Sequence, residues 1–269
     1  MKNENKTFFE NVVIITGASV GIGKELALQL AQQGAWLALA ARNFEQLQQV
    51  AEQCQQAGGR AIAIATDVAD KSQCKRLVEQ TIDEYGRIDT LINNAGITMS
   101  SRFKDIKDLS IFDKIMQVNY LGSVYTTYYA LPYLRQTKGR IVGISSLTGK
   151  NGVPTRTGYA ASKHAMAGFF DSLRIELEDD GISVTMIYPG FVATEIRYRA
   201  LSSDGIPLGK SHLNEENIMS AEKCARLIID AAAKRKREVV MTAKGKLGLW
   251  MKLIAPRLVD KVAKKAIEQ

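Results

Sequence analysis

"NVVIITGASVGIGKELA", residues 11–27, carries the strongest evidence on the fold, because an apolar strand pattern passes through three glycines into a helix pattern. Gly17 permits a tight turn, Gly21 lets the backbone approach a pyrophosphate, and Gly23 allows the following helix to pack closely. The N-terminus of such a helix offers N–H groups and a positive dipole end to phosphates. We therefore predict a strand, a turn and a helix that bind a dinucleotide.

Short apolar runs alternate with helical patterns along the rest of the 269 residues. Strands that are buried on both faces are apolar almost throughout, and β-α alternation produces a parallel sheet with right-handed crossovers. Asn43 and Asp70 are the expected N-caps of two of the helices. The predicted strands are 11–16, 35–41, 60–66, 90–93, 140–145, 183–188 and 238–241. We predict an α/β fold: a single doubly wound Rossmann-type domain over residues 1–243, with a mainly parallel seven-stranded sheet and helices on both faces.

The charges separate the body of the chain from its end. Of 36 basic and 28 acidic residues, the stretch 234–269 holds 11 and three, which accounts for the net charge of +8. A formally neutral body argues against a nucleic-acid-binding protein. The three cysteines are far apart and lack a C-x-x-C pair, which indicates neither disulfides nor a metal site. With no signal-peptide pattern, we expect a cytoplasmic protein.

The residues after the second predicted strand indicate which dinucleotide binds. An acidic residue there would bind the 2′-hydroxyl of the adenosine ribose. This chain has Ala41 and then Arg42, and a guanidinium favours a 2′-phosphate. Arg42 could instead be an ordinary surface charge, but the missing carboxylate favours NADP(H).

A tyrosine and a lysine in GYAASKHA (158–165) indicate proton transfer. Tyr159 and Lys163 are four positions apart, so a helix places them on one face. A nearby cation lowers the pKa of a tyrosine, and such a phenol can give a proton to a carbonyl oxygen or take one from an alcohol. The alternative is a core tyrosine beside a surface lysine, because this pair is common by chance.

With these features assembled, the sequence resembles the short-chain dehydrogenase/reductase family, and within it the hydroxysteroid-dehydrogenase-like branch. TGASVGIG (16–23) matches the T-G-x-x-x-G-x-G turn of that family. The other matching motifs, in order, are NNAG (93–96), MQVNYLG (116–122), GISSLTGK (143–150), GYAASKHA (158–165) and YPGFVATEI (188–196). The resemblance covers roughly residues 8–242 and implies hydride transfer between a nicotinamide and a carbonyl or carbinol carbon.

The resemblance also implies a role for each motif residue. Tyr159 is the expected general acid/base, and Lys163 is the partner that adjusts its pKa and binds the nicotinamide ribose. Ser146 would hydrogen-bond the reacting oxygen, whereas its neighbour Ser145 faces the other side of the strand. Asn119 would hold a water that links Lys163 to solvent.

The implied cofactor contacts come from several loops. Asp67 and Val68 would lie beside the adenine and Asn94 near its ribose, and residues 189–194 would surround the nicotinamide. The full set is Gly17, Ser19, Gly21, Ile22, Gly23, Arg42, Asp67, Val68, Asn94, Tyr159, Lys163, Pro189, Gly190, Val192 and Thr194.

The resemblance places the substrate between the loop after the fifth strand and a substrate loop at 191–218. Apolar side chains there favour an apolar ketone, aldehyde or alcohol, steroid-like or lipid-like. They are Leu147, Val153, Pro154, Phe191, Ile196, Tyr198, Leu201, Ile206 and Leu208. Arg197 and Arg199 could meet an acidic group, although exposed arginines are the default, and His212 is expected to be a surface loop residue. A 3-oxoacyl thioester is the alternative substrate.

Two other classes of protein are weighed against a reductase. A non-catalytic NADP(H)-binding sensor or scaffold needs the glycine turn but not the Asn–Ser–Tyr–Lys set, so the intact set favours an enzyme. A sugar-nucleotide epimerase or dehydratase shares Y-x-x-x-K but usually needs a longer C-terminal substrate domain than this chain has room for.

Two further surfaces predict partners. Residues 244–269 form a basic amphipathic tail, which Pro256 should divide into two short helices. Apolar and basic side chains with a tryptophan are typical of a segment that lies in a membrane interface. The alternative is that these faces pack on this domain or on a partner subunit. Apolar helices around 108–134 and 157–179, which pair across a two-fold axis in the family, predict a homodimer or homotetramer.

Overall fold

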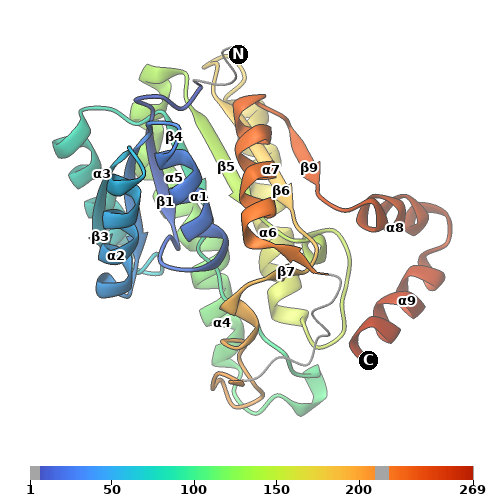
Figure 1. Ribbon diagram of the computed structural model, residues 1–269. Coiled ribbons are helices and arrows are strands. Elements are labelled where there is room, and N and C mark those ends of the chain that lie inside the picture. The colour runs from blue at the N-terminus through green and yellow to red at the C-terminus, as the bar shows by residue number, and fades with distance from the viewer. Residues whose placement is uncertain (1–6, 210–217, 269) are drawn as a thin grey trace.

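A seven-stranded sheet forms the centre of the molecule in the computed structural model, which describes residues 7–209 and 218–268 (Figure 1). The strand order is β3-β2-β1-β4-β5-β6-β9, and each neighbouring pair is parallel. The strands are β1 (Val12–Thr16), β2 (Trp36–Ala41), β3 (Arg60–Ala65), β4 (Thr90–Asn93), β5 (Arg140–Ile144), β6 (Ser183–Tyr188) and β9 (Glu238–Val240). The predicted parallel α/β sheet is confirmed, with each strand within about a residue of its expected bounds.

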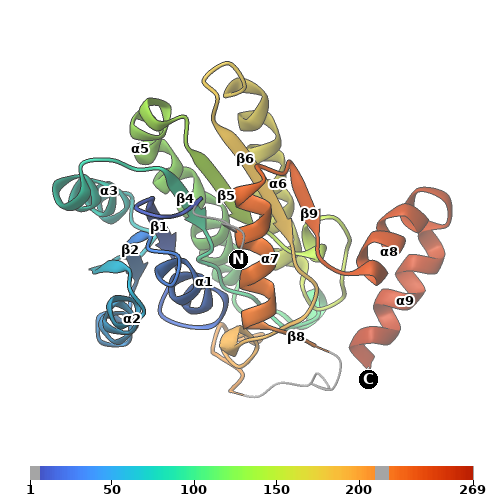
Figure 2. The same cartoon turned by 45° about the horizontal axis from the view of Figure 1, so that its top comes forward.

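Helices cover both faces of this sheet, as Figure 2 shows. Helices α1, α2 and α7 pack on one face and α3, α5 and α6 on the other, each set around its own apolar core. Helix α4 packs against α6. The helices are α1 (Gly21–Ala31), α2 (Phe44–Gln56), α3 (Lys71–Tyr85), α4 (Ser110–Met116), α5 (Gly122–Thr137), α6 (Thr157–Glu176) and α7 (Ala221–Ala233).

The expected helix starts are confirmed at two positions. The side chain of Asn43 accepts a hydrogen bond from the Gln46 amide at 3.0 Å, at the start of α2. Asp70 Oδ1 accepts from the amides of Ser72 and Gln73 at 2.8 and 3.2 Å, at the start of α3. Each bond satisfies a first-turn N–H that the helix itself leaves without a partner.

Some short elements lie outside the sequence prediction. Strands β7 (Val192–Ala193) and β8 (Met219–Ser220) pair in parallel beside the main sheet. A π-helical segment, η2 (Gln117–Leu121), joins α4 to α5. Two-residue strands and a single wide turn leave no periodicity in the sequence, so pattern reading has nothing to detect there. Three 3-10 segments complete the set: η1 (Phe103–Asp105), η3 (Leu147–Gly149) and η4 (Glu195–Arg197).

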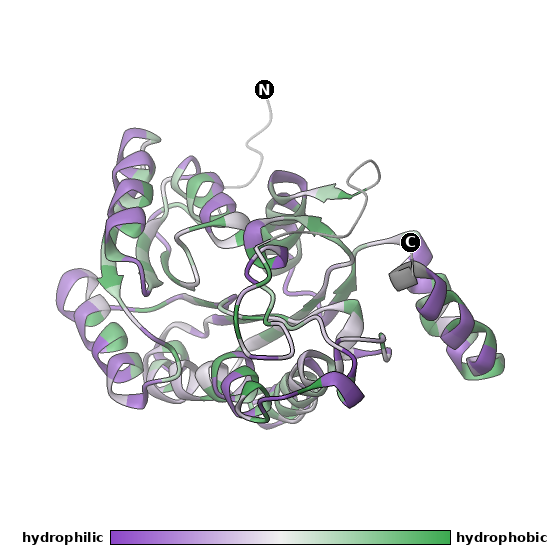
Figure 3. Cartoon of the chain, turned by 90° about the horizontal axis from the view of Figure 1, so that it is seen from below, coloured by the Kyte–Doolittle hydropathy of each residue, from purple (hydrophilic) through white to green (hydrophobic). Residues whose placement is uncertain are grey.

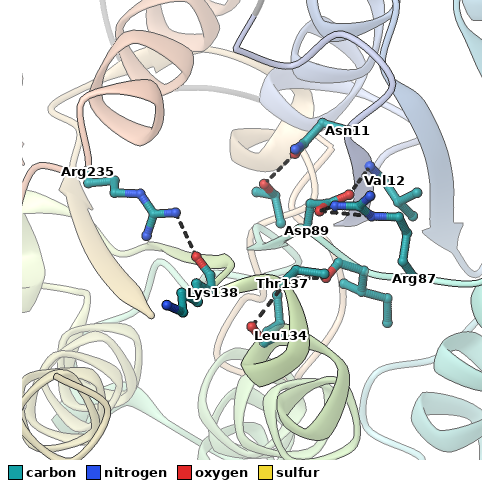
Figure 4. Close-up of polar contacts among 10 residues, drawn as sticks. Asn11, Val12, Arg87, Asp89, Leu134, Thr137, Lys138 and Arg235 are labelled. Carbon is teal, nitrogen blue, oxygen red and sulfur yellow. Dashed lines mark hydrogen bonds and ion pairs between the residues drawn. The ribbon is translucent and has the colours of Figure 1, made fainter. Parts of the chain in front are cut away.

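Polar contacts close the edge of the sheet at which its strands begin (Figure 4). The buried carboxylate of Asp89 accepts a hydrogen bond from the Val12 amide at 2.9 Å, just before β4 and at the start of β1. The Arg235 guanidinium donates to the carbonyls of Lys138 and Gly181 at 2.6 and 3.1 Å, which ties the end of α7 to the turns before β5 and β6. This edge is therefore occupied by structural contacts, and the opposite edge is left for a ligand.

The C-terminal tail projects from the body of the molecule (Figure 1) and contacts it at Leu249, which packs against the core. It consists of α8 (Ala243–Ile254) and α9 (Pro256–Glu268), which pack against each other. Pro256 is the first residue of α9, where its missing N–H costs nothing, so the predicted division of the tail is confirmed. No helix in the part of the chain that the structure describes is both long and apolar enough to cross a membrane.

Candidate active site

The ends of β1, β4, β5 and β6 bring the predicted site residues to one edge of the sheet. The chain order reverses between β1 and β4, which are neighbours in space but are separated by β2 and β3 in sequence. Ligands of doubly wound sheets bind at such a reversal, beyond the carboxyl ends of the strands. The turn after β1 and the loops after β4, β5 and β6 all lie at this edge.

The turn from β1 into α1 has the shape that a phosphate requires. Gly21 has φ of 57°, and a Cβ on it would lie 3.1 Å from the side chain of Thr194. A Cβ on Gly23 would lie 2.2 Å from the Gly17 carbonyl oxygen, so a side chain cannot fit there. Among the described residues no side chain caps α1, whereas Asn43 and Asp70 cap α2 and α3. The first N–H groups of α1 therefore remain for a dinucleotide phosphate, and this turn fits a nicotinamide dinucleotide.

Asn94 supports this turn from the end of β4. Its Nδ2 donates to the carbonyls of Thr16 and Gly17 at 2.9 and 3.1 Å, and Thr16 Oγ1 accepts from the amides of Asn94 and Ala95 at 3.0 Å each. The side-chain amide of Asn94 thus holds the glycine turn in place. The resemblance implied a ribose contact for this residue, and the structure gives it a positioning role as well.

The other predicted cofactor residues lie around the same edge. Arg42 is exposed directly after β2, where Ala41 is buried, and it forms no ion pair with any described residue. Asp67 Oδ1 accepts from the Ala69 amide at 3.0 Å. The Pro189 carbonyl accepts from Leu147 at 2.9 Å. Ser19, Ile22, Gly190 and Thr194 are partly buried, and Val68 and Val192 are buried.

Asn119 is fixed by the π-helical segment. Its side chain accepts a hydrogen bond from the Ile97 amide at 2.8 Å and donates to the Ile97 carbonyl and to Ser162 Oγ, both at 2.9 Å. The wide turn at Gln117–Leu121 directs the amide toward the loop after β4. Asn119 therefore joins that loop to α6, the helix that carries Tyr159 and Lys163.

Lys163 is a buried lysine, with 3% of its surface exposed. Its Nζ donates to the Ile144 carbonyl at 2.8 Å, and burial lowers its pKa to about 8. A Cβ on Gly96 would lie 3.2 Å from Asn119 Oδ1 and 3.5 Å from Lys163 Nζ. These two polar groups therefore both lie close to Gly96, where a side chain would crowd Asn119.

Tyr159 is half-buried, and its ring packs beside the apolar cluster of Met99, Ile111, Ile115 and Leu201. Burial is the largest influence on the phenol and raises its pKa. A hydrogen bond with Ser146 and the charge of Arg156 act in the opposite direction. The expectation that Lys163 lowers this pKa is not met in the protein alone, because its Nζ lies 5.9 Å from the ring centre and is directed to Ile144.

The two serines after β5 have different surroundings. The Ser146 side chain interacts with the Tyr159 phenol and lowers its pKa, and its Oγ accepts from the Thr148 amide at 3.3 Å. Ser145 is buried and donates to the Lys163 carbonyl at 3.2 Å. The structure thus brings Ser146, rather than Ser145, to the phenol, as strand alternation predicts.

The segment after β6 packs against the apolar cluster beside Tyr159. Leu201 forms bridges with Met99 and Pro207, and its side chain is buried. Of the predicted apolar lining, Phe191, Tyr198 and Ile206 are exposed, and the others are partly or fully buried except Pro154. Residues 210–217 of the predicted substrate loop, His212 among them, lie outside the described residues.

Of the two predicted arginines after β6, one is exposed as expected and the other is not. Arg199 is exposed and forms an ion pair with Glu195, which is the default for such a residue. Arg197 is instead buried. Arg156, which sequence reasoning missed, interacts electrostatically with Tyr159. Its position directly before α6 and three residues before Tyr159 was the available signal.

Comparisons with known proteins agree with this geometry. A family model described as short chain dehydrogenase matches residues 11–204. "11-beta-hydroxysteroid dehydrogenase-like 4A" of Arabidopsis thaliana is 37% identical over 249 residues, which cover 92% of this chain and 82% of that protein. "Dehydrogenase/reductase SDR family protein 7-like" of Dictyostelium discoideum is 37% identical over 267 residues, which cover 97% of this chain and 83% of that protein.

Solved structures share the fold at lower identity. A short chain dehydrogenase/reductase from Burkholderia phymatum, in complex with NAD, has a TM-score of 0.81 at 22% identity, covering 94% of this chain and 96% of that one. An alcohol dehydrogenase from Thermococcus sibiricus, complexed with 5-hydroxy-NADP, has a TM-score of 0.75 at 24% identity, covering 85% of this chain and 94% of that one.

Proposed function

Since this chain belongs to the short-chain dehydrogenase/reductase family, in its hydroxysteroid-dehydrogenase-like branch, we propose that it transfers a hydride between NADP(H) and a carbonyl or secondary alcohol of a largely apolar substrate. The observation that carries this proposal is the meeting of Ser146, Tyr159, Lys163 and Asn119 at the edge of the sheet where the glycine turn lies. A sensor or scaffold would need the turn alone.

Each of these residues has one task in the proposed reaction. When bound, the nicotinamide supplies or accepts the hydride. In reduction, the Tyr159 hydroxyl gives its proton to the carbonyl oxygen, and the Ser146 hydroxyl hydrogen-bonds the same oxygen. Burial keeps Tyr159 protonated, which suits a proton donor. Lys163 and Asn119, which both lie beside Gly96, would return a proton to the phenol through water.

A substrate panel tests the proposal directly. We expect NADPH-dependent reduction of apolar ketones and aldehydes, measured by nicotinamide absorbance, and we expect little activity on sugar nucleotides. A 3-oxoacyl thioester belongs in the same panel, since it is the main alternative substrate. Tight NADPH binding without turnover of any carbonyl compound would favour the sensor instead.

We propose NADP(H) rather than NAD(H) because of the end of β2. Arg42 is exposed there and unpaired among the described residues, and Ala41 stands where an acid would bind a ribose hydroxyl. The guanidinium is thus available to a 2′-phosphate.

We also propose that the protein self-associates through α5 and α6. Tyr128 of α5 is 68% exposed and Ile175 of α6 is 65% exposed, although most apolar residues of these helices pack in the core. An isologous contact would cover both. Light scattering at micromolar concentration should give a dimer or tetramer, and a strict monomer would contradict this.

We propose that the protein is cytoplasmic and that its tail contacts an anionic membrane surface. Its large apolar side chains remain exposed, among them Trp250 at 63% and Leu253 at 81%. Both hydrophobic and hydrophilic residues run along the two helices (Figure 3). Between residues 244 and 268 the tail has seven basic and two acidic residues, so its charge complements anionic lipid. Packing on the body of the same chain does not cover these side chains.

Vesicle binding tests the tail with the intact protein. We expect the full-length protein to sediment with vesicles of phosphatidylserine and phosphatidylcholine at low salt, and to be released as salt screens the charges. Trp250→Ser with Leu253→Ser keeps every charge and removes exposed apolar surface, so it should bind weakly while retaining activity. Phe103→Ser, an exposed aromatic outside the tail, is the matched control. If full-length protein stays in the supernatant at low salt, the tail faces a partner subunit instead.

A further inference from the structure

Arg156 is held beside Tyr159 by its surroundings. It precedes α6, and its Nη1 donates to Thr98 Oγ1 at 2.8 Å, in the loop after β4. The residue before it, Thr155, has φ of 66°, a left-handed conformation that is uncommon for a β-branched residue. Such backbone strain persists only where the surrounding structure holds it, so the direction of this segment is fixed.

Arg197 is a second guanidinium in the same region. It is 7% exposed, and its Nη2 donates to the Val192 carbonyl at 2.9 Å. Its Nη1 is buried without a hydrogen-bond partner. Arg199, two positions later, is exposed and already paired with Glu195. Of these two arginines, the buried Arg197 is therefore the one with an N–H donor that has no hydrogen-bond acceptor.

Neither guanidinium is paired with a carboxylate among the described residues. Burial lowers the pKa of Arg156, and the charge of Arg197 lowers it further. Within residues 7–209 and 218–268 no carboxylate forms an ion pair with either side chain. Buried charges are normally paired, because an unpaired one is costly. The described part of the chain therefore supplies no anion to two guanidiniums, one of which interacts with the proposed proton donor.

We propose that Arg156 and Arg197 bind an anionic group of the substrate, a carboxylate or a phosphate, so that the substrate is an oxo acid or the corresponding hydroxy acid. This inference rests on the proposed function, because it places the reacting carbonyl at Tyr159. A guanidinium suits the planar, two-oxygen geometry of such an anion. The exposed apolar side chains of Phe191, Tyr198 and Ile206, in the segment after β6, would contact the rest of the substrate.

Matched pairs of substrates test the charge requirement. 5-oxohexanoate and its methyl ester differ in the anionic group, and hydroxyacetone phosphate and hydroxyacetone form a phosphate pair. We expect the unmodified protein to have a higher kcat/KM for the anionic member of at least one pair. Preference in the first pair alone identifies a carboxylate, and preference in the second alone identifies a phosphate; either supports the proposal.

Variants then assign the preference to the two arginines. Arg156→Met and Arg197→Met should each lower kcat/KM for the preferred anion by roughly tenfold or more while leaving its neutral partner little changed. Because both substrates meet the same Tyr159, an altered phenol pKa cancels in their ratio. Arg156→Lys should keep part of the preference. Arg199→Met, which removes an exposed and already paired arginine, should keep all of it.

The outcomes separate this inference from the proposed function. Equal kcat/KM for anionic and neutral substrates, or a ratio that neither methionine variant changes, overturns the inference and leaves the reductase intact. A raised KM for NADPH with an unchanged substrate ratio also overturns it, since the arginines would then serve the cofactor. Absence of turnover on every carbonyl compound contradicts the proposed function itself.

Discussion

Tyr159→Phe is expected to lower kcat by roughly two to four orders of magnitude, because the ring remains and the proton donor is lost. The phenol interacts with Ser146, whose hydroxyl is expected to hydrogen-bond the substrate oxygen without supplying its proton. The ring packs beside Met99 and Leu201, and phenylalanine preserves that contact. Stability should therefore change little, and the loss should appear in turnover and not in NADPH binding.

Tyr85→Phe is the matched control for this substitution. Tyr85 is a buried tyrosine, and its hydroxyl donates to the Leu37 carbonyl at 3.2 Å, within the α3–β2 packing. Its loss should lower the melting temperature slightly and leave kcat unchanged. Circular dichroism and initial rates on one carbonyl substrate measure both effects. Near-full turnover by Tyr159→Phe would mean that another group supplies the proton.

Ala41→Asp combined with Arg42→Ala should reverse the cofactor preference, with a change of about a hundredfold or more in the NADPH-to-NADH ratio of kcat/KM. A hydrogen bond to a charged group contributes about 1.5–3 kcal/mol, which is roughly ten- to a hundredfold for the lost guanidinium–phosphate contact alone. The new carboxylate adds repulsion of the 2′-phosphate and a partner for the 2′-hydroxyl.

The single variant Arg42→Ala isolates the loss of the guanidinium–phosphate contact. Both cofactors are titrated against each protein. Arg76→Ala, at an exposed position in α3, removes the same charge away from β2 and should leave the preference unchanged. If the unmodified protein binds NADH more tightly than NADPH, then Arg42 is a surface charge and NAD(H) is the cofactor.

The sequence predicted the sheet well, because its evidence is local and repeated. Each buried strand is an apolar run, and the turn after β1 has glycines where a side chain would collide with Gly17 or Thr194. The Asn43 and Asp70 caps depend on residues within three positions of each other. These features are determined by neighbours in sequence, so they can be predicted without knowledge of the fold.

The electrostatics of the site could not be predicted in the same way. The pairing of Tyr159 with Lys163 gave the correct helix face, but the direction of the lysine depends on the Ile144 carbonyl, which belongs to β5. The burial of Arg197 depends on how the segment after β6 folds against Thr98 and Met99. Such effects arise from contacts between distant segments, for which residue spacing provides no signal.

The burial of Lys163 makes the folding of this protein exchange protons with the solvent. An unfolded chain holds this proton up to a pKa of about 10.4, whereas burial lowers the pKa of the folded protein to about 8. Between these two values the unfolded chain binds more protons than the folded one, so unfolding takes up a proton and the free energy of unfolding rises with pH. Below pH 8 both states are protonated, and the folded protein bears the whole cost of a buried ammonium. At neutral pH this lysine therefore lowers the free energy of unfolding of the ligand-free enzyme. A ligand that contacts the ammonium would raise that free energy again.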